Sequence, residues 1–186
     1  MKVVFYLALV LLTMTDLAGQ DRQVQTVPSV DLERYAGKWY EIARYPNKFQ
    51  KQCLSNVTAT YARKPKERIE VLNECAKSGG KLDSAKGEAK VVDKRSNAKL
   101  KVRFAPGFLS AFGFVWGDYW VIDLGENYEY AVVGDPDRKY LWILSRNAEM
   151  SDSVYQGILQ RVKAQGFDPD KLIKTPQNTA PARSAD

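Results

Sequence analysis

The stretch "GKWYEIARYPN", residues 37–47, alternates charged and apolar side chains after a glycine and stops at a proline. Such alternation is typical of a β-strand with one wet face and one dry face. Two interpretations are open at this point. The run is either an ordinary half-buried edge strand or the strand at which a β-barrel closes around an apolar cavity. The choice decides whether the protein has an internal ligand site.

The same alternation of polar and apolar residues continues along the chain, and turn residues interrupt it at short intervals. An all-β protein with antiparallel strands is therefore predicted, as an up-and-down barrel or as a sandwich. The expected strands lie near 38–45, 54–63, 68–76, 86–92, 99–104, 118–124, 128–134 and 139–145.

Alternation within these strands separates a wet face from a dry face, as the wall of a barrel requires. Tyr119 and Tyr130 are expected to add hydrogen-bonding hydroxyl groups to the dry face. The apolar residues predicted for this face are Ala59, Tyr61, Ile69, Val71, Val91, Leu100, Val102 and Phe104.

The strands expected near 118–124, 128–134 and 139–145 carry apolar side chains on both faces, so their outer face needs cover. Ser151 can cap a helix over 152–165 that supplies this cover. A single helix packed outside the barrel is predicted. Its apolar stripe comprises Val154, Tyr155, Ile158, Leu159 and Val162.

Two cysteines occur in the chain. If the strands near 54–63 and 68–76 form a hairpin centred on Lys64, Cys53 lies directly opposite Cys75. Facing positions on antiparallel strands are close enough for a disulfide, which is the predicted state of this pair. The alternative is a reactive thiol.

The ends of the chain are expected to lie outside the barrel domain. Residues 1–19 contain an early lysine and a short apolar run, and they end in small residues of the kind found at cleavage sites. This pattern predicts a secretory signal peptide. A buried N-terminal helix is the alternative. We expect a mobile segment over 20–30, one domain over 31–176 and a disordered tail over 177–186. Gln20 stands where a bacterial lipobox would have its cysteine, so we expect an unlipidated protein.

The chain contains 28 Lys and Arg residues, 22 Asp and Glu residues and no histidine, for a formal net charge of +6. The basic residues are spread out or interleaved with other types, which favours solvated faces over a nucleic-acid partner. The lack of histidine excludes Ser-His-Asp and Cys-His catalysis and histidine-ligated metals. The scattered carboxylates form no metal-like cluster, so neither a metal nor another cofactor is expected.

The chain resembles the lipocalins, and among them the bacterial outer-membrane lipocalins and apolipoprotein D. The resemblance rests on "GKWYEIARYP" at 37–46, "GDPDRKYLWILSR" at 134–146 and the single helix that follows, and it covers residues 28–176. The second motif departs from the family pattern, because Gly134 stands where threonine is common.

The resemblance implies an eight-stranded antiparallel up-and-down barrel that is plugged at one end. In lipocalins the tryptophan of a G-x-W motif packs across the closed end, and an arginine from the last strand stacks on it. Gly37, Trp39 and Arg146 occupy those places. The plug turns the barrel into a cup whose dry face would bind a fatty acid, a lysophospholipid or a similar amphiphile.

The resemblance also implies lipid storage or transport for envelope maintenance, in the periplasm or at the outer membrane, or after secretion from a eukaryotic cell. The alternative is a lipid-modifying enzyme on the same barrel, which would use Cys53 or an activated tyrosine. The apolar segment 104–119 either packs in the interior or forms an apolar lip at the mouth, which we call the greasy lip. We expect the lip, which would line the ligand entrance or touch a membrane surface.

Overall fold

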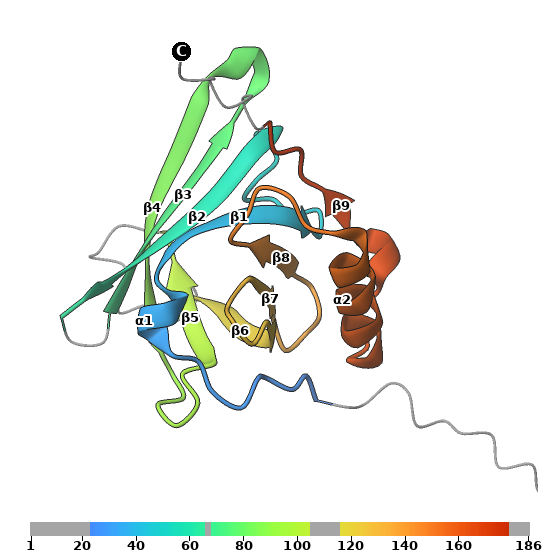
Figure 1. Ribbon diagram of the computed structural model, residues 1–186. Coiled ribbons are helices and arrows are strands. Elements are labelled where there is room, and N and C mark those ends of the chain that lie inside the picture. The colour runs from blue at the N-terminus through green and yellow to red at the C-terminus, as the bar shows by residue number, and fades with distance from the viewer. Residues whose placement is uncertain (1–22, 66–67, 105–115, 179–186) are drawn as a thin grey trace, which may run out of the picture.

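Within residues 23–65, 68–104 and 116–178, which the computed structural model describes, eight antiparallel strands form a closed barrel with one further short strand (Figure 1). The alternative of a sandwich is thereby excluded. The barrel strands are β1 (Gly37–Arg44), β2 (Ser55–Lys64), β3 (Arg68–Ala76), β4 (Leu82–Val91), β5 (Lys99–Arg103), β6 (Gly117–Leu124), β7 (Tyr130–Gly134) and β8 (Leu141–Ser145). The remaining elements are α1 (Leu32–Tyr35), α2 (Asp152–Ala164), β9 (Ile173–Lys174) and two 3-10 turns at Ser78–Gly80 and Pro169–Lys171.

Strand β1 closes the barrel, because it pairs with a strand on each side. Along its first half it pairs with β2, from Gly37 opposite Tyr61 to Tyr40 opposite Thr58. On its other edge it pairs with β8 up to Arg44. The residues of the opening motif therefore form the closing strand and not an edge strand.

The second half of β1, which ends at Arg44, has a different second neighbour. Here β9 takes the place of β2, and the chain after β9 continues along the seam where β1 and β2 separate (Figure 1). The backbone N–H of Thr175 donates to the carbonyl of Ile42 at 2.9 Å. On the other side, the N–H of Asn56 donates to the carbonyl of Pro176 at 2.9 Å. We call residues 173–178 the C-terminal strap.

Gln177 fastens this strap to both barrel strands. Its side-chain amide donates to the carbonyls of Glu41 in β1 and Val57 in β2, both at 2.9 Å. The backbone N–H of Asn178 donates to the side chain of Asn56. The tail predicted to be disordered from 177 onward therefore begins with two ordered residues, and its remainder lies outside the described residues.

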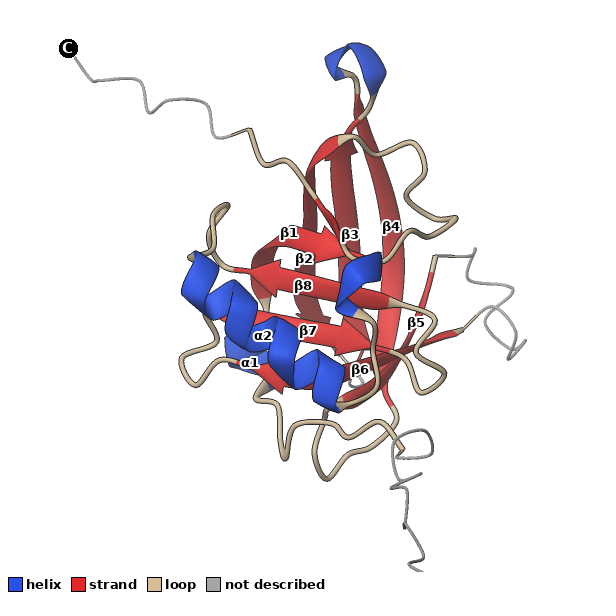
Figure 2. Ribbon diagram, turned by 90° about the vertical axis from the view of Figure 1, so that its right-hand side faces the viewer, coloured by secondary structure: helices blue, strands red, loops and turns tan. Residues whose placement is uncertain are grey.

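Helix α2 covers the outer face of β6, β7 and β8 (Figure 2). The hydroxyl of Ser151 accepts a hydrogen bond from the N–H of Val154, which caps the first turn as expected. Tyr155, Ile158 and Val162 are buried, whereas Val154 of the predicted stripe is exposed. The predicted helix outside the barrel is confirmed.

Residues 23–30, which belong to the segment predicted to be mobile, contact the barrel. Their backbone donates hydrogen bonds from Val27 to Val121 at 3.0 Å and from Val30 to Ser96 at 2.7 Å. Val24 and Val30 are almost fully buried. The segment therefore packs against the barrel, while the predicted signal peptide lies outside the described residues.

The β2–β3 hairpin has a different register from the predicted one. Ala59 pairs with Asn73, four residues beyond the expected partner Ile69. An even slip leaves every side chain on its predicted face. Cys53 lies outside this ladder, in the segment before β2, where the N–H of Leu54 donates to the carbonyl of Ala76 at the end of β3. The predicted disulfide to Cys75 is confirmed, with the Cα atoms 5.5 Å apart.

The barrel is plugged at the end where β1 begins. Trp39 is fully buried, and the guanidinium carbon of Arg146 lies 3.8 Å from the centre of its ring system. Arg146 also donates to the backbone carbonyls of Lys38 at 3.0 Å and Arg34 at 2.5 Å. Gly37 has a φ of +95°, and a β-carbon there would lie 3.4 Å from Arg146. The contact therefore ties α1, β1 and the end of β8 together.

We expect the variant Cys53→Ser/Cys75→Ser to lose about 3 kcal/mol of unfolding free energy, because an unlinked loop of this length is less restricted in the unfolded chain. Urea denaturation of the oxidised protein and the variant measures the difference. Thiol titration of the folded, oxidised protein is the control and should find no free sulfhydryl at either position. Two reactive thiols, or equal stability, would contradict the linkage.

We expect Trp39→Ala to lose about 3–5 kcal/mol, because it removes a large buried aromatic side chain. Trp39→Phe keeps an aromatic face beneath Arg146 and should lose much less. The midpoints of urea unfolding compare the three proteins. An unchanged midpoint in Trp39→Ala would show that the plug does not stabilise the barrel.

Candidate functional site

The inside of the barrel holds a continuous apolar cluster, which we call the interior cluster. Every barrel strand contributes to it, and so do α1 and the ordered N-terminal segment. Closure of the barrel keeps this surface away from water without any cover from outside. Its buried members are Val30, Tyr35, Trp39, Tyr61, Ile69, Val71, Ala89, Ala98, Leu100, Val121, Tyr128, Ala131, Val133 and Leu144.

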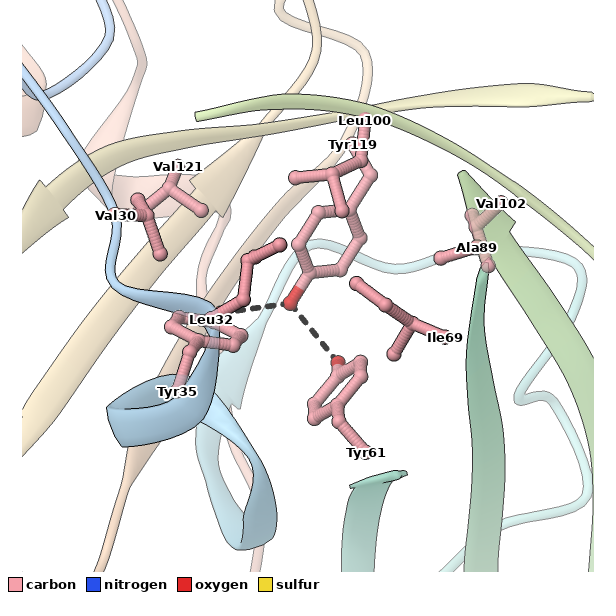
Figure 3. Close-up of a pocket in the computed structure, with 10 residues that line it drawn as sticks. All are labelled: Val30, Leu32, Tyr35, Tyr61, Ile69, Ala89, Leu100, Val102, Tyr119 and Val121. Atoms are coloured by element: carbon pink, nitrogen blue, oxygen red, sulfur yellow. Dashed lines mark hydrogen bonds between the residues drawn. The ribbon is translucent and has the colours of Figure 1, made fainter. Parts of the chain in front are cut away.

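A small hollow, the basal hollow, lies within this cluster (Figure 3). Its volume is about 10 Å³, which is space for about one water molecule. A long ligand therefore either lies elsewhere in the barrel or displaces these side chains. The residues that line it are Val30, Leu32, Tyr35, Tyr61, Ile69, Ala89, Leu100, Val102, Tyr119 and Val121.

Three tyrosine hydroxyls meet at the basal hollow (Figure 3). The hydroxyl of Tyr119 is hydrogen-bonded to that of Tyr35 at 2.8 Å and to that of Tyr61 at 2.9 Å. Burial raises the pKa of Tyr61 to about 12 and raises the pKa of Tyr35 and Tyr119 well above the ordinary tyrosine value. All three stay protonated at neutral pH. Three protons serve two mutual bonds, so one proton is available to a further acceptor.

Most of the predicted lining residues face the inside of the barrel. Val71 belongs to the interior cluster, and Ala59 and Val91 pack against it. Phe104 is 44% exposed, and its ring lies against Gly87 on the neighbouring strand. Those that line the basal hollow itself are Tyr61, Ile69, Leu100, Val102 and Tyr119.

Tyr130 lies outside the barrel, so its predicted place in the lining is wrong. It packs with the outer cluster beneath α2, and its hydroxyl accepts a hydrogen bond from Arg161 at 3.0 Å. Its neighbours Ala131 and Val133 face inward instead. Because β7 is apolar on both faces, alternation alone cannot tell its inner face from its outer face.

Several residues of the basal hollow were not among the predicted lining. Ala89 lies two residues before Val91, and Val121 lies two residues after Tyr119. The alternation along the strands could therefore have predicted both as lining residues. Val30 lies in the irregular segment before the barrel, and Leu32 lies in the single-turn helix α1. No periodicity places such residues, and their positions come from the tertiary structure.

A second, more open hollow of about 400 Å³ lies elsewhere in the described part of the chain, where Lys38, Tyr40 and Gln177 are among its lining residues. No group of three or more acidic or cysteine side chains that could hold a metal ion occurs within the described ranges. None of the helices in these ranges is both long and apolar enough to span a membrane. Most of the predicted greasy lip, residues 105–115, lies outside the described residues.

Comparisons with known proteins agree with this geometry. Residues 30–177 match the family described as a lipocalin-like domain. The chain is 41% identical over 167 residues to temperature-induced lipocalin-1 of Arabidopsis thaliana, covering 89% of each chain. It is 39% identical to outer membrane lipoprotein Blc of Escherichia coli K12, with 82% of each covered, and 30% identical to mouse apolipoprotein D, with 90% of each covered.

Among solved structures, insecticyanin from the tobacco hornworm Manduca sexta has a TM-score of 0.65 at 23% identity, covering 88% of each chain. Apocrustacyanin C1 has a TM-score of 0.63 at 17% identity, covering 81% of each chain. Similarity at these identities shows the fold alone. The family match and the close relatives show more, because they span nearly the whole barrel. The chain belongs to the lipocalin family.

Proposed function

We propose that the protein binds a hydrophobic or amphiphilic small molecule inside its barrel, and that it stores or transports this ligand. The observation that carries the proposal is a closed barrel with a continuous apolar interior, plugged at one end by Trp39 and Arg146. A cup of this kind shields an apolar molecule from water, and lipocalins bind hydrophobic ligands.

The ligand class that suits this interior is a single-chain amphiphile such as a fatty acid or a lysophospholipid. An apolar tail gains about 0.8 kcal/mol per buried methylene before ordering costs. The ligand-binding role of the dry-face residues is part of this proposal.

We further propose that the protein acts outside the reducing cytosol. The disulfide between Cys53 and Cys75 favours an oxidising compartment. One group of relatives is named as outer membrane lipoproteins, which favours a role in maintaining envelope lipids. Gln20 in place of a lipobox cysteine predicts that this protein works without a lipid anchor at that residue.

A lipid-modifying enzyme was the second candidate, and two observations weigh against its proposed nucleophiles. The thiol of Cys53 is consumed in the disulfide. Burial raises the pKa of Tyr35, Tyr61 and Tyr119, which disfavours a reactive phenolate at neutral pH. Peripheral membrane contact stays a prediction, because it rests on the segment 104–119.

We expect the affinity for saturated fatty acids to rise with chain length and then to level off when the cup is full. The limit for complete burial is about fourfold per methylene, from 0.8 kcal/mol. Tryptophan fluorescence during titration with acids of increasing length measures the affinities. Equal affinities across the series would place the ligand outside the barrel.

We expect Val102→Asp to weaken binding sharply, because it places a charge in the apolar wall of the basal hollow. Val92→Asp is a matched control, since Val92 is 54% exposed and lies outside the hollow. Circular dichroism checks that both variants fold. Undiminished affinity in folded Val102→Asp would contradict the assigned site.

A further inference from the structure

A bulge in β1 directs two charged side chains into the barrel. Glu41 pairs with Leu144 of β8, but the next paired residue is Ala43, opposite Ile143, so one extra residue lies in β1 between them. In a regular strand, residues three positions apart point to opposite faces. The bulge adds one position, so Glu41 and Arg44 point to the same face.

That face is the inner one. Leu144, opposite Glu41, belongs to the interior cluster, and Trp142, opposite Arg44, packs against it. Ala43, between the two charges, belongs instead to the outer cluster beneath α2. The charge of Glu41 also contributes to the raised pKa of Tyr61, as expected if both groups face the same interior.

The carboxylate of Glu41 has a full set of partners. One oxygen accepts hydrogen bonds from Nη1 of Arg44 at 2.8 Å and from the hydroxyl of Thr175 at 2.5 Å. The other oxygen accepts a hydrogen bond from the amide of Gln50 at 2.6 Å. Glu41 is 2% exposed, so protein groups replace its lost water almost completely.

Arg44 is only partly satisfied. Its Nη1 donates to Glu41 and, at 3.0 Å, to Thr175. Its Nε is buried without a hydrogen-bond partner, and its Nη2 makes no hydrogen bond to any described residue. The side chain as a whole is only 9% exposed, and Nε is the atom that water does not reach. The Nε–Nη2 edge of a guanidinium is suited to two parallel hydrogen bonds with a carboxylate or a phosphate.

A buried ion pair with an orphaned donor stabilises a fold less than apolar side chains of similar size would. Its place in an otherwise apolar chamber therefore suggests a task other than stability. Trp39 and Arg44 lie on the same strand, so the plug and the charged pair mark two levels of one chamber. The tyrosine group lies at the lower level, because Tyr61 pairs with Gly37 at the start of β1.

We propose that Arg44 forms the headgroup subsite for an anionic amphiphile, binding carboxylate or phosphate oxygens through Nε and Nη2 while Nη1 stays on Glu41. This inference rests on the proposed function and adds the charge of the ligand to it. Glu41, Gln50 and Thr175 are positioning residues, since they hold the guanidinium without using its second edge. The tail of the ligand then points toward the tyrosine group.

The test compares ligands that differ only in their headgroup. A fatty acid is paired with the fatty alcohol of equal length, and a lysophosphatidic acid with the matching monoacylglycerol. In the full-length protein each anionic ligand that fits the subsite should bind at least about tenfold more tightly than its neutral counterpart. The pair with the larger ratio identifies carboxylate or phosphate as the preferred headgroup.

The variant Glu41→Gln/Arg44→Gln removes both charges together, so it leaves no buried charge unpaired. Its ratio of anionic to neutral affinity should fall to about one, with the affinity for the neutral ligand unchanged. Arg44→Lys keeps the charge but loses the paired Nε and Nη2 donors, so its ratio should fall severalfold. This variant provides a second test if the double variant fails to fold. Lys139→Gln removes an exposed charge as the control and should keep the ratio of the unaltered protein.

A ratio near one in the unaltered protein, or an undiminished ratio in the folded double variant or in Arg44→Lys, would overturn the headgroup assignment. Neutral ligands whose affinity still rises with chain length would leave the proposed function standing in that case. Failure of both acids and alcohols to bind would instead contradict the proposed function itself.

Discussion

The closed barrel depends on the backbone hydrogen bonds that β1 makes along both of its edges. Pairing with β8 on one side and with β2 and then β9 on the other removes the free sheet edges that an open sheet would expose. Every other feature of the interior follows from this constraint. Trp39 can plug the barrel only because β1 sits between its neighbours, and Arg146 reaches it from the end of β8. The apolar side chains then have no route to water through the wall.

The interior divides into two chemical levels. At the base, three neutral hydroxyls and apolar side chains pack so closely that only a water-sized hollow remains (Figure 3). Higher on β1, a charged pair lies in the same low-dielectric space, and Thr175 from the C-terminal strap completes its contacts. An apolar molecule is complementary in chemistry to the first level alone, where it would displace side chains. An amphiphile with an anionic headgroup is complementary to both levels. The arrangement therefore favours one orientation of the ligand along the barrel.

The sequence pattern predicted the fold because alternation, short turns and the capped helix all indicated the same architecture. The pattern failed where the two faces of a strand do not differ in polarity. Tyr130 was assigned to the wrong face because both faces of β7 are apolar. The contacts of residues 23–30 could not be predicted, because they are backbone hydrogen bonds to residues far away in the sequence. The disulfide was predicted correctly although the register was four residues away from the true one, because Cys53 lies before β2 and reaches Cys75 from outside the ladder. The bulge beside Glu41 has no signature in a single sequence, so the inward position of Arg44 required the structure.

The C-terminal strap has a consequence for the order in which the protein can fold. Arg44 and Thr175 are 131 positions apart, so the first strand leaves the ribosome long before the residues that seal its upper seam. During that interval β1 also lacks β8, and its unpaired backbone groups are exposed as an edge. Closure is thus a late step, because it joins the two ends of the barrel sequence. A chain released before Ile173 would keep its seam unsealed.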